Sequence, residues 1–135
     1  MSATGPRGLS FTGSVALPVG SATVNGPFID LGMYTEFLGD NETITVTAPS
    51  LTTGQLANGA TMIYSVQADR GQKFENPTTI SAALIVQTGA GGAGSAGANA
   101  TLTLPRGFYR FLRVVAVNSG SQDCSASSMS WDVEL

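Results

Sequence analysis

The run of residues 104–117, Leu-Pro-Arg-Gly-Phe-Tyr-Arg-Phe-Leu-Arg-Val-Val-Ala-Val, limits the fold more than any other part of the chain. Aromatic and β-branched side chains follow its Pro-Arg-Gly turn at nearly every position, and such side chains pack well on the pleated surface of a strand. A strand that is apolar on both faces belongs at the centre of a packed sheet, or at an interface that covers its second face. The two alternating sets are Tyr109, Phe111, Val115 and Val117 on one face, and Phe108, Leu112, Val114 and Ala116 on the other.

Short segments of alternating apolar and polar residues, separated by Gly, Pro and Asn, make up much of the remaining chain. In residues 42–48 the side chains of Ile, Val and Ala alternate with those of Thr, which is the pattern of a half-buried strand. The cleanest alternation is in the C-terminal segment, where the side chains expected to point inward are Met129, Trp131, Val133 and Leu135. Further strands are expected at residues 14–17, 21–24, 28–31, 60–68, 78–88 and 100–104, and in residues 78–88 the side chains of Ile80, Leu84 and Val86 are expected to share one face. In the polar segment 69–77, Phe74 is the single apolar residue, and it is expected to pin this loop to the sheet edge.

About eight short strands with frequent turn residues, and no convincing helix, predict an all-β fold, an antiparallel jelly roll or β-sandwich. The Gly/Ala-rich segment 89–100 is interpreted as a flexible loop, and residues 100–104 are expected to pair with residues 78–88 as a hairpin around it. Residues 1–13, rich in Gly, Ser and Thr, predict a flexible N-terminal arm, and residues 14–135 a single β-sandwich domain.

Charged residues make up only 11% of the chain, against roughly 25% of an average globular protein. A surface of Gly, Ala, Ser and Thr suits close packing against another protein; the alternative is a stable β-domain that simply exposes Thr and Ser. The net charge of −3 argues against nucleic acid as a partner, because phosphate contacts need clustered cations. No apolar run of roughly 18–20 residues predicts a membrane span, and the N-terminus lacks a secretory pattern, so synthesis in a cytoplasm is expected.

Residue types that carry catalysis are scarce in this sequence. The chain has no histidine and one cysteine, Cys124, which has no His to act as its base and no partner for an intrachain disulfide. The carboxylates are dispersed, and Asp40 with Glu42 lacks the further oxygen ligands that Ca²⁺ requires. Trp131 is expected to be a core residue rather than a ligand platform. The sequence therefore predicts no catalytic site, no metal and no cofactor, and a protein that is not an enzyme.

Three segments, in this order, carry a resemblance to a known family. They are Phe-Ile-Asp-Leu-Gly at 28–32, Ser-Val-Gln-Ala-Asp-Arg-Gly-Gln-Lys-Phe-Glu-Asn-Pro-Thr-Thr-Ile at 65–80, and Leu-Pro-Arg-Gly-Phe-Tyr-Arg-Phe-Leu-Arg-Val at 104–114. Together they resemble the small jelly-roll capsid cement, or decoration, proteins of tailed bacteriophages, the group typified by the Bordetella phage cement protein. The resemblance covers most of residues 28–117; the Gly/Ala run is longer than is usual in the family.

The resemblance implies a structural role in the virion. Such proteins sit in many copies on the outer surface of the capsid, bridge neighbouring major capsid subunits, and form oligomers, so the expected partners are the major capsid protein and further copies of this chain, as a homodimer or homotrimer. The expected location is the outer surface of a phage head, after synthesis in the cytoplasm of the host bacterium. The residues expected at capsid or subunit interfaces are Arg7, Leu9, Phe11, Arg70, Lys73, Phe74, Arg110 and Arg113.

Two other functions are weighed against this one. A glycan-binding jelly roll from a phage tail or host-recognition structure would expose aromatic side chains along a groove, with Asp or Asn nearby. A glycosidase would need two selected carboxylates, and nothing in the sequence selects them. For Arg110 and Arg113, the simpler alternative to an interface role is that each pairs with a local carboxylate.

Overall fold

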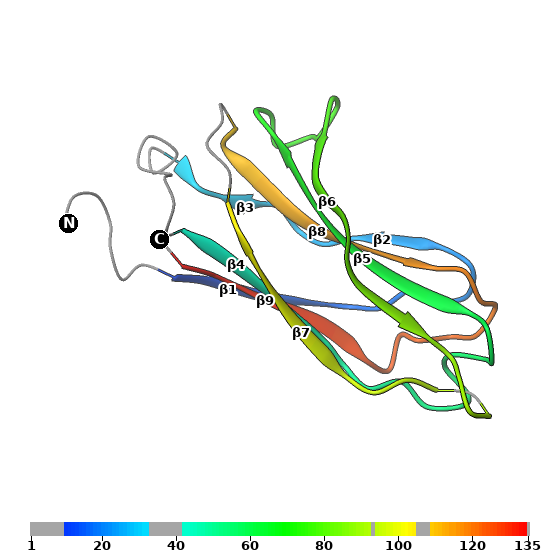
Figure 1. Cartoon of the computed structure of the whole chain (residues 1–135). Coiled ribbons are helices and arrows are strands. Elements are labelled where there is room, and N and C mark those ends of the chain that lie inside the picture. The colour runs from blue at the N-terminus through cyan, green and yellow to red at the C-terminus, as the bar shows by residue number, and fades with distance from the viewer. Residues whose placement is uncertain (1–9, 33–41, 93, 105–108, 135) are drawn as a thin grey trace.

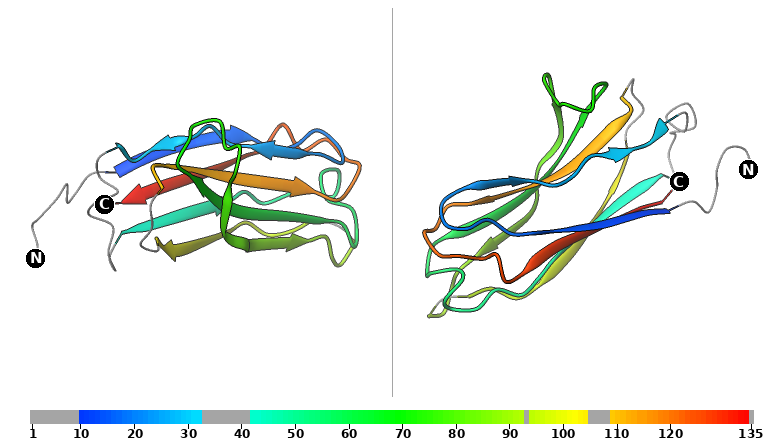
Figure 2. Two further views of the ribbon diagram at one scale, coloured as in Figure 1. Left: turned by 90° about the horizontal axis from the view of Figure 1, so that it is seen from above. Right: turned by 180° about the vertical axis from the view of Figure 1, so that it is seen from behind.

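The computed structural model describes residues 10–32, 42–92, 94–104 and 109–134, and within them the chain forms two β-sheets packed face to face (Figures 1 and 2). One sheet contains, in spatial order, β1 (Ser10–Ala16), β9 (Ser128–Glu134), β4 (Thr43–Ala48) and β7 (Ala98–Thr103). The other contains β2 (Thr23–Asn25), β8 (Phe111–Asn118), β5 (Thr61–Asp69) and β6 (Thr78–Thr88), and β3 (Ile29–Asp30) also pairs with β8. All of these strand pairs are antiparallel.

The strand order is that of a jelly roll. β2 and β3 pair with different parts of β8, so they are two pieces of one edge strand that is interrupted at Gly26 and Pro27. The chain then passes repeatedly from one sheet to the other, with only β5 and β6 as consecutive neighbours within a sheet. The predicted all-β jelly roll is therefore confirmed, and β8, from the apolar run 104–117, lies inside its sheet between β5 and the β2–β3 edge.

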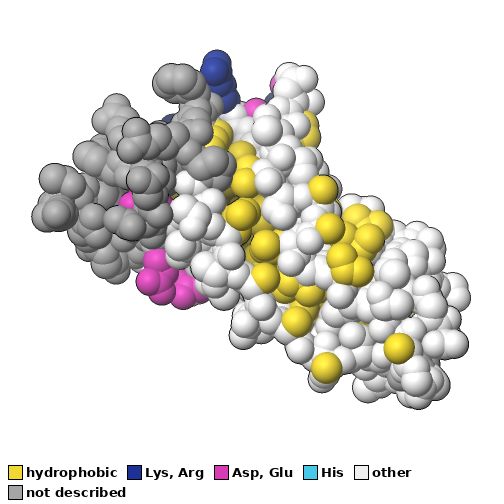
Figure 3. Space-filling view, viewed as in Figure 1, with side chains coloured by type: hydrophobic (Ala, Val, Ile, Leu, Met, Phe, Trp, Pro, Cys, Tyr) yellow, Lys and Arg dark blue, Asp and Glu magenta, His cyan; other side chains and the backbone are white. Residues whose placement is uncertain are grey.

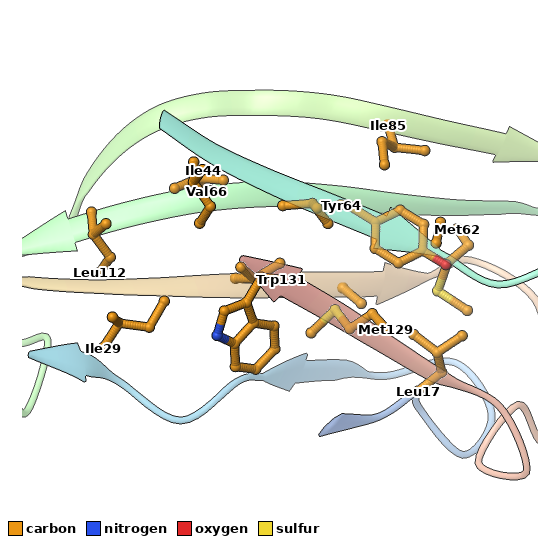
Figure 4. Packing of buried hydrophobic residues seen from close by; sticks show 14 of the residues in the cluster. Leu17, Ile29, Ile44, Met62, Tyr64, Val66, Ile85, Leu112, Met129 and Trp131 are labelled. Carbon is orange, nitrogen blue, oxygen red and sulfur yellow. The ribbon is translucent and has the colours of Figure 1, made fainter. Parts of the chain in front are cut away.

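The core lies between the two sheets and is built from the alternating positions that the sequence indicated. Ile44, Met129 and Trp131 project from one sheet, and Tyr64 and Leu112 project from the other, into the same apolar layer (Figure 4). Trp131 is 4% exposed, which confirms it as a core residue. Its indole ring lies so close to Gly13 that a Cβ atom there would come within 2.7 Å of it.

The boundary between the predicted arm and the domain is corrected at residues 10–13. These residues form the first half of β1, because β1 pairs with β9 in unbroken register from Ser10 opposite Glu134 to Ala16 opposite Ser128. Residues 1–9 lie outside the described residues, and the division into an arm and one domain stays a prediction.

The predicted hairpin between residues 78–88 and 100–104 is wrong. β7 pairs with β4 in the other sheet, and the Gly/Ala-rich segment carries the chain across the end of the sandwich. Backbone hydrogen bonds hold this segment against the loop that follows β4: Gly94 N donates to Leu56 O at 2.7 Å, and Ser95 N to Leu51 O at 2.9 Å. The glycines allow this close approach because they have no side chain. A run of small residues in a sequence is equally consistent with a flexible loop and with such a close-packed segment.

The assignment of one face of β6 to Ile80, Leu84 and Val86 is correct only in part. Ile80 and Leu84 pack against the core, but Val86 is exposed and its neighbour Ile85 is buried instead. The register between β5 and β6 shifts twice along the pair. Each extra residue in a strand turns the following side chains to the opposite face, so a simple alternation fails across a bulge.

The close packing of the crossover predicts a strong effect at Gly89. A Cβ atom at this position would lie 2.1 Å from the carbonyl oxygen of Ala57, so the Gly89→Ala variant must displace backbone. We expect it to lose about 1–3 kcal/mol of unfolding free energy, as overpacked sites do. Urea unfolding measures the loss. The matched control is Gly71→Ala, where a Cβ meets no atom within 4 Å; equal midpoints for the two variants would contradict the prediction.

Candidate functional site

The three segments that carry the family resemblance meet at one end of the β2–β8–β5–β6 sheet, at the top of Figure 1. Phe111, at the start of β8, pairs with Asp30 of β3 on one side and with Asp69 of β5 on the other. Leu31 N donates to Arg110 O at 2.8 Å, and Arg110 N to Asp69 O at 3.2 Å. We call this region the basic end; it comprises Phe28, Asp30, Asp69, Arg70, Lys73, Phe74, Arg110, Phe111 and Arg113.

Asp69 orders the polar loop between β5 and β6. Its Oδ1 accepts hydrogen bonds from the backbone N–H groups of Arg70 (2.6 Å) and Gly71 (3.3 Å), and its Oδ2 accepts one from Asn76 (3.0 Å). Desolvation acts to raise the pKa of this carboxyl, but the three backbone donors outweigh it and lower the pKa. Because one side chain holds both ends of the loop, Arg70 and Lys73 are carried on an ordered turn.

Phe74 anchors the same loop on the outer face of the sheet. Its side chain is buried. Its backbone is left-handed, with φ at 52°, and among the described residues no other non-glycine residue has a positive φ. The guanidinium of Arg113 lies over its ring, 4.4 Å from the ring centre, and Arg113 Nε donates to Gln67 Oε1 at 2.8 Å. Burial lowers the pKa of Arg113 and the nearby Asp69 opposes this. The sequence predicted that Phe74 pins the loop at the sheet edge; its stacking partner is in fact Arg113, on the internal strand β8.

Arg110 forms a two-point ion pair with Asp30. Its Nε lies 2.7 Å from Asp30 Oδ1 and its Nη2 lies 2.9 Å from Oδ2. The hydrogen bonds from Arg110 hold the pKa of Asp30 below its usual value. The side chains are 55% and 39% exposed, so this pair contributes little to stability and is screened by salt. Pairing with a local carboxylate, the simpler alternative, is thus confirmed for Arg110, while Arg113 uses Gln67.

An exposed phenylalanine, Phe28, lies beside these charges. Its ring meets Phe111 edge to face, with the ring centres 5.3 Å apart, and it remains 47% exposed although Phe111 is buried. The guanidinium of Arg110 lies 5.2 Å from the centre of the Phe111 ring. Sequence reasoning missed Phe28 as a surface residue; its position just after Pro27, at a break in the edge strand, was the available signal.

The outer faces of the two sheets differ in chemistry. On the β2–β8–β5–β6 sheet, Ile63 lies between Val86 and Val117, and the two valines are 51% and 40% exposed. The β1–β9–β4–β7 sheet presents mainly hydroxyl groups. One row across its four strands consists of Thr12, Asp132, Thr45 and Thr101. The sheet that carries the basic end is therefore the one with an apolar outer surface.

The basic end gathers five of the eight residues that the sequence placed at interfaces. Arg70 and Lys73 are exposed on the loop. Figure 3 shows side chains of the Lys and Arg type at the upper end of the molecule. Phe74, Arg110 and Arg113 are described above. Phe11 lies in the other sheet, partly buried against the core. The remaining two, Arg7 and Leu9, lie outside the described residues.

The acidic side chains and the one cysteine do not gather into a metal site in the described part of the chain. This part contains no group of three or more His, Cys, Asp or Glu side chains that could hold a metal ion. The thiol of Cys124 is buried and donates to Gln55 O at 3.1 Å, and burial raises its pKa. No helix in the described ranges is long and apolar enough to cross a membrane.

Comparisons with known proteins give no family. No protein-family model matches the chain, and no curated protein matches it. Two structures of infectious bursal disease virus are similar over 94% (Gx strain) and 95% (Gt strain) of this chain. The TM-scores are 0.37 and 0.32 and the identities 10% and 12%. The chain spans only 32% and 30% of those longer chains. Similarity of this degree does not assign a fold or a function, and the jelly roll rests on the strand order above.

The role of Asp69 predicts a change in proteolysis. The Asp69→Ala variant loses the acceptors for three backbone N–H groups, so the loop should open and trypsin should cut after Arg70 and Lys73 several-fold faster than in the wild type. Fragment masses over a digestion time course measure this. Asp123→Ala is the control, because Asp123 holds a comparable turn through Ser125 in a loop without Lys or Arg. Unchanged cleavage at Arg70 and Lys73 would show that Asp69 does not order the loop.

Proposed function

We propose that this chain is a structural protein of a tailed-phage virion, a cement protein that binds the outer surface of the head and stabilises contacts between major capsid subunits. It acts by binding and not by catalysis. The observation that carries the proposal is the convergence described above: three segments, separated by long stretches of sequence, are joined by strand pairing and side-chain contacts at the basic end. They are the same segments that resemble the cement family.

The chemistry of this sheet supports a protein surface as the partner. The exposed ring of Phe28 and the guanidinium of Arg110 both contact the ring of Phe111. The apolar row at Ile63, Val86 and Val117 lies on the same outer face. Aromatic side chains and Arg are enriched at protein interfaces, and a rim of charges steers association. The hydroxyl-rich face of the other sheet suits contact with water. We therefore assign the β2–β8–β5–β6 face to the capsid.

Many weak contacts suffice for such a protein. A cement protein touches several capsid subunits at once, and each added contact raises the total affinity without a large individual interface.

The glycan-binding alternative has less support. It requires aromatic rings lining a groove, but Trp131 and Tyr64 are buried in the core. Among the described residues, Phe28 is the aromatic side chain with large exposure, and Arg110 and Phe111 occupy its surroundings.

Binding to capsids tests the proposal directly. Purified protein mixed with expanded, undecorated capsids should bind saturably and in a fixed ratio to the major capsid protein, as measured by co-sedimentation. The double variant Arg70→Ser and Lys73→Ser should bind about tenfold more weakly, because it removes two exposed cations from the basic end. The control is Thr12→Glu with Thr47→Glu, which lowers the net charge by the same two units on the hydroxyl face. Absent saturation, or equal weakening in both variants, would overturn the proposal.

The N-terminal arm needs a separate test with a corrected boundary. A deletion through residue 13 would remove half of β1, including the contact between Gly13 and Trp131, and would destabilise the domain. Deletion of residues 1–9 leaves β1 whole, and we expect it to lower capsid occupancy while the urea midpoint stays unchanged. Undiminished occupancy would exclude a role of the arm in binding.

A further inference from the structure

We propose that the outer edge of β7 is a dimerisation site, at which two copies of this chain pair antiparallel about a twofold axis. This pairing would join two four-stranded sheets into one of eight strands. It would also cover the apolar seam between β6 and β7, which is formed by Ile80, Leu84, Ala100 and Leu102. The inference concerns the chain in solution and does not depend on the proposed function.

β7 is an edge strand without the usual protection. Within the described residues it pairs with β4 alone, so its other edge presents backbone N–H and C=O groups. The register with β4 runs unbroken from Ala98 to Thr103, and the strand contains no charged residue and no proline. Soluble proteins normally blunt such an edge with Lys, Pro or a bulge, because a regular edge is a template for another strand.

The neighbouring edges differ from β7. β6, the edge of the other sheet on the same side, shifts register twice against β5, and such bulges disfavour regular pairing with a further strand. β1 is also uncharged, but on its side the ring of Trp131 lies against Gly13 and Gly26 and fills the space between the sheets. β7 is therefore the edge strand that is both regular and unprotected, and it lies beside the apolar seam.

The seam beside β7 is lined by apolar side chains that are only partly buried. Ala100 and Leu102 from β7, with Ile80 and Leu84 from β6, pack against the core without being enclosed by it. Figure 3 shows a band of hydrophobic side chains along this side of the molecule. Covering such surface is favourable by roughly 25 cal/mol per Å², so an added strand that also shields the seam gains more than backbone hydrogen bonds.

The sequence of β7 fits a second copy of itself. In a twofold pairing centred on Thr101, Leu102 of each copy lies opposite Ala100 of the other, which sets a large side chain against a small one on the seam face. Asn99 then lies opposite Thr103 on the hydroxyl face. Because β7 carries no charge, the pairing brings no like charges together. Two antiparallel copies of one strand are related by a twofold axis, so both copies use the same surface and the contact is closed.

Charge substitutions at Thr101 test this pairing. Thr101 is exposed on the outer face and its hydroxyl contacts that of Thr45, so the monomer should tolerate a longer side chain. We expect the wild type to sediment as a dimer, and Thr101→Lys and Thr101→Glu each to sediment at half that mass. An equimolar mixture of the two variants should restore the dimer, because opposite charges then face each other. A misfolded variant would not be rescued in this way. The matched controls are Thr12→Lys and Thr12→Glu on the opposite edge, β1, which should remain dimeric.

Two results would overturn the inference. One is a wild type that sediments as a monomer throughout the accessible concentration range; the other is a Thr101→Lys variant that stays dimeric. If the wild type is monomeric and Thr101→Lys, unlike Thr12→Lys, loses occupancy on capsids, then the edge of β7 receives a strand of the capsid protein and not a second copy. Dimerisation is measured without capsids, so its outcome is separate from that of the capsid-binding test.

Discussion

The side chain of Gln87 holds the two sheets together at the end opposite the basic end. It is buried at the end of β6, accepts a hydrogen bond from Tyr64 O–H at 2.6 Å, and donates to Pro49 O at 2.7 Å and Ala96 O at 3.0 Å. Burial raises the pKa of Tyr64, so its hydroxyl stays protonated and donates. A buried amide with these partners positions the end of β4 and the approach to β7 relative to β6, whereas an unpartnered one would be costly.

This interaction explains both the success and the limit of the sequence analysis. The apolar alternation of β4, β5 and β9 identifies strands and their inward faces, because burial of every second side chain follows from strand geometry alone. The alternation does not say which strands are neighbours. The pairing of the strands depends on contacts such as those of Gln87, a polar residue within an apolar segment. It also depends on Gly89, because only a residue without a side chain can lie so close to Ala57. The wrong hairpin and the misassigned face of β6 both result from this gap.

For the candidate site, the sequence likewise indicated individual residues but not their arrangement in space. The segments that carry the family resemblance contain Arg70, Lys73, Phe74, Arg110 and Arg113, and this placement indicated them as interface residues. Their meeting in space was not predictable, because it depends on β3 and β5 flanking β8, a long-range pairing that no local pattern encodes. Phe28 was missed because an aromatic residue near a strand is normally read as core. Its exposure follows from the stacking on Phe111, which takes the buried position.

The two ends of the sandwich are thus stabilised by different interactions. At the Gln87 end, backbone hydrogen bonds and buried amides join loops that carry almost no charge, and this end can be rigid without any partner. At the basic end, the exposed ion pair of Arg110 with Asp30 and the stacked guanidinium of Arg113 position side chains that stay accessible to another molecule. Exposed ion pairs add little stability to a monomer, and their value is greater where a partner excludes water around them. A protein with so few charges that places its described cations at one end of one sheet is therefore organised for contact at that end.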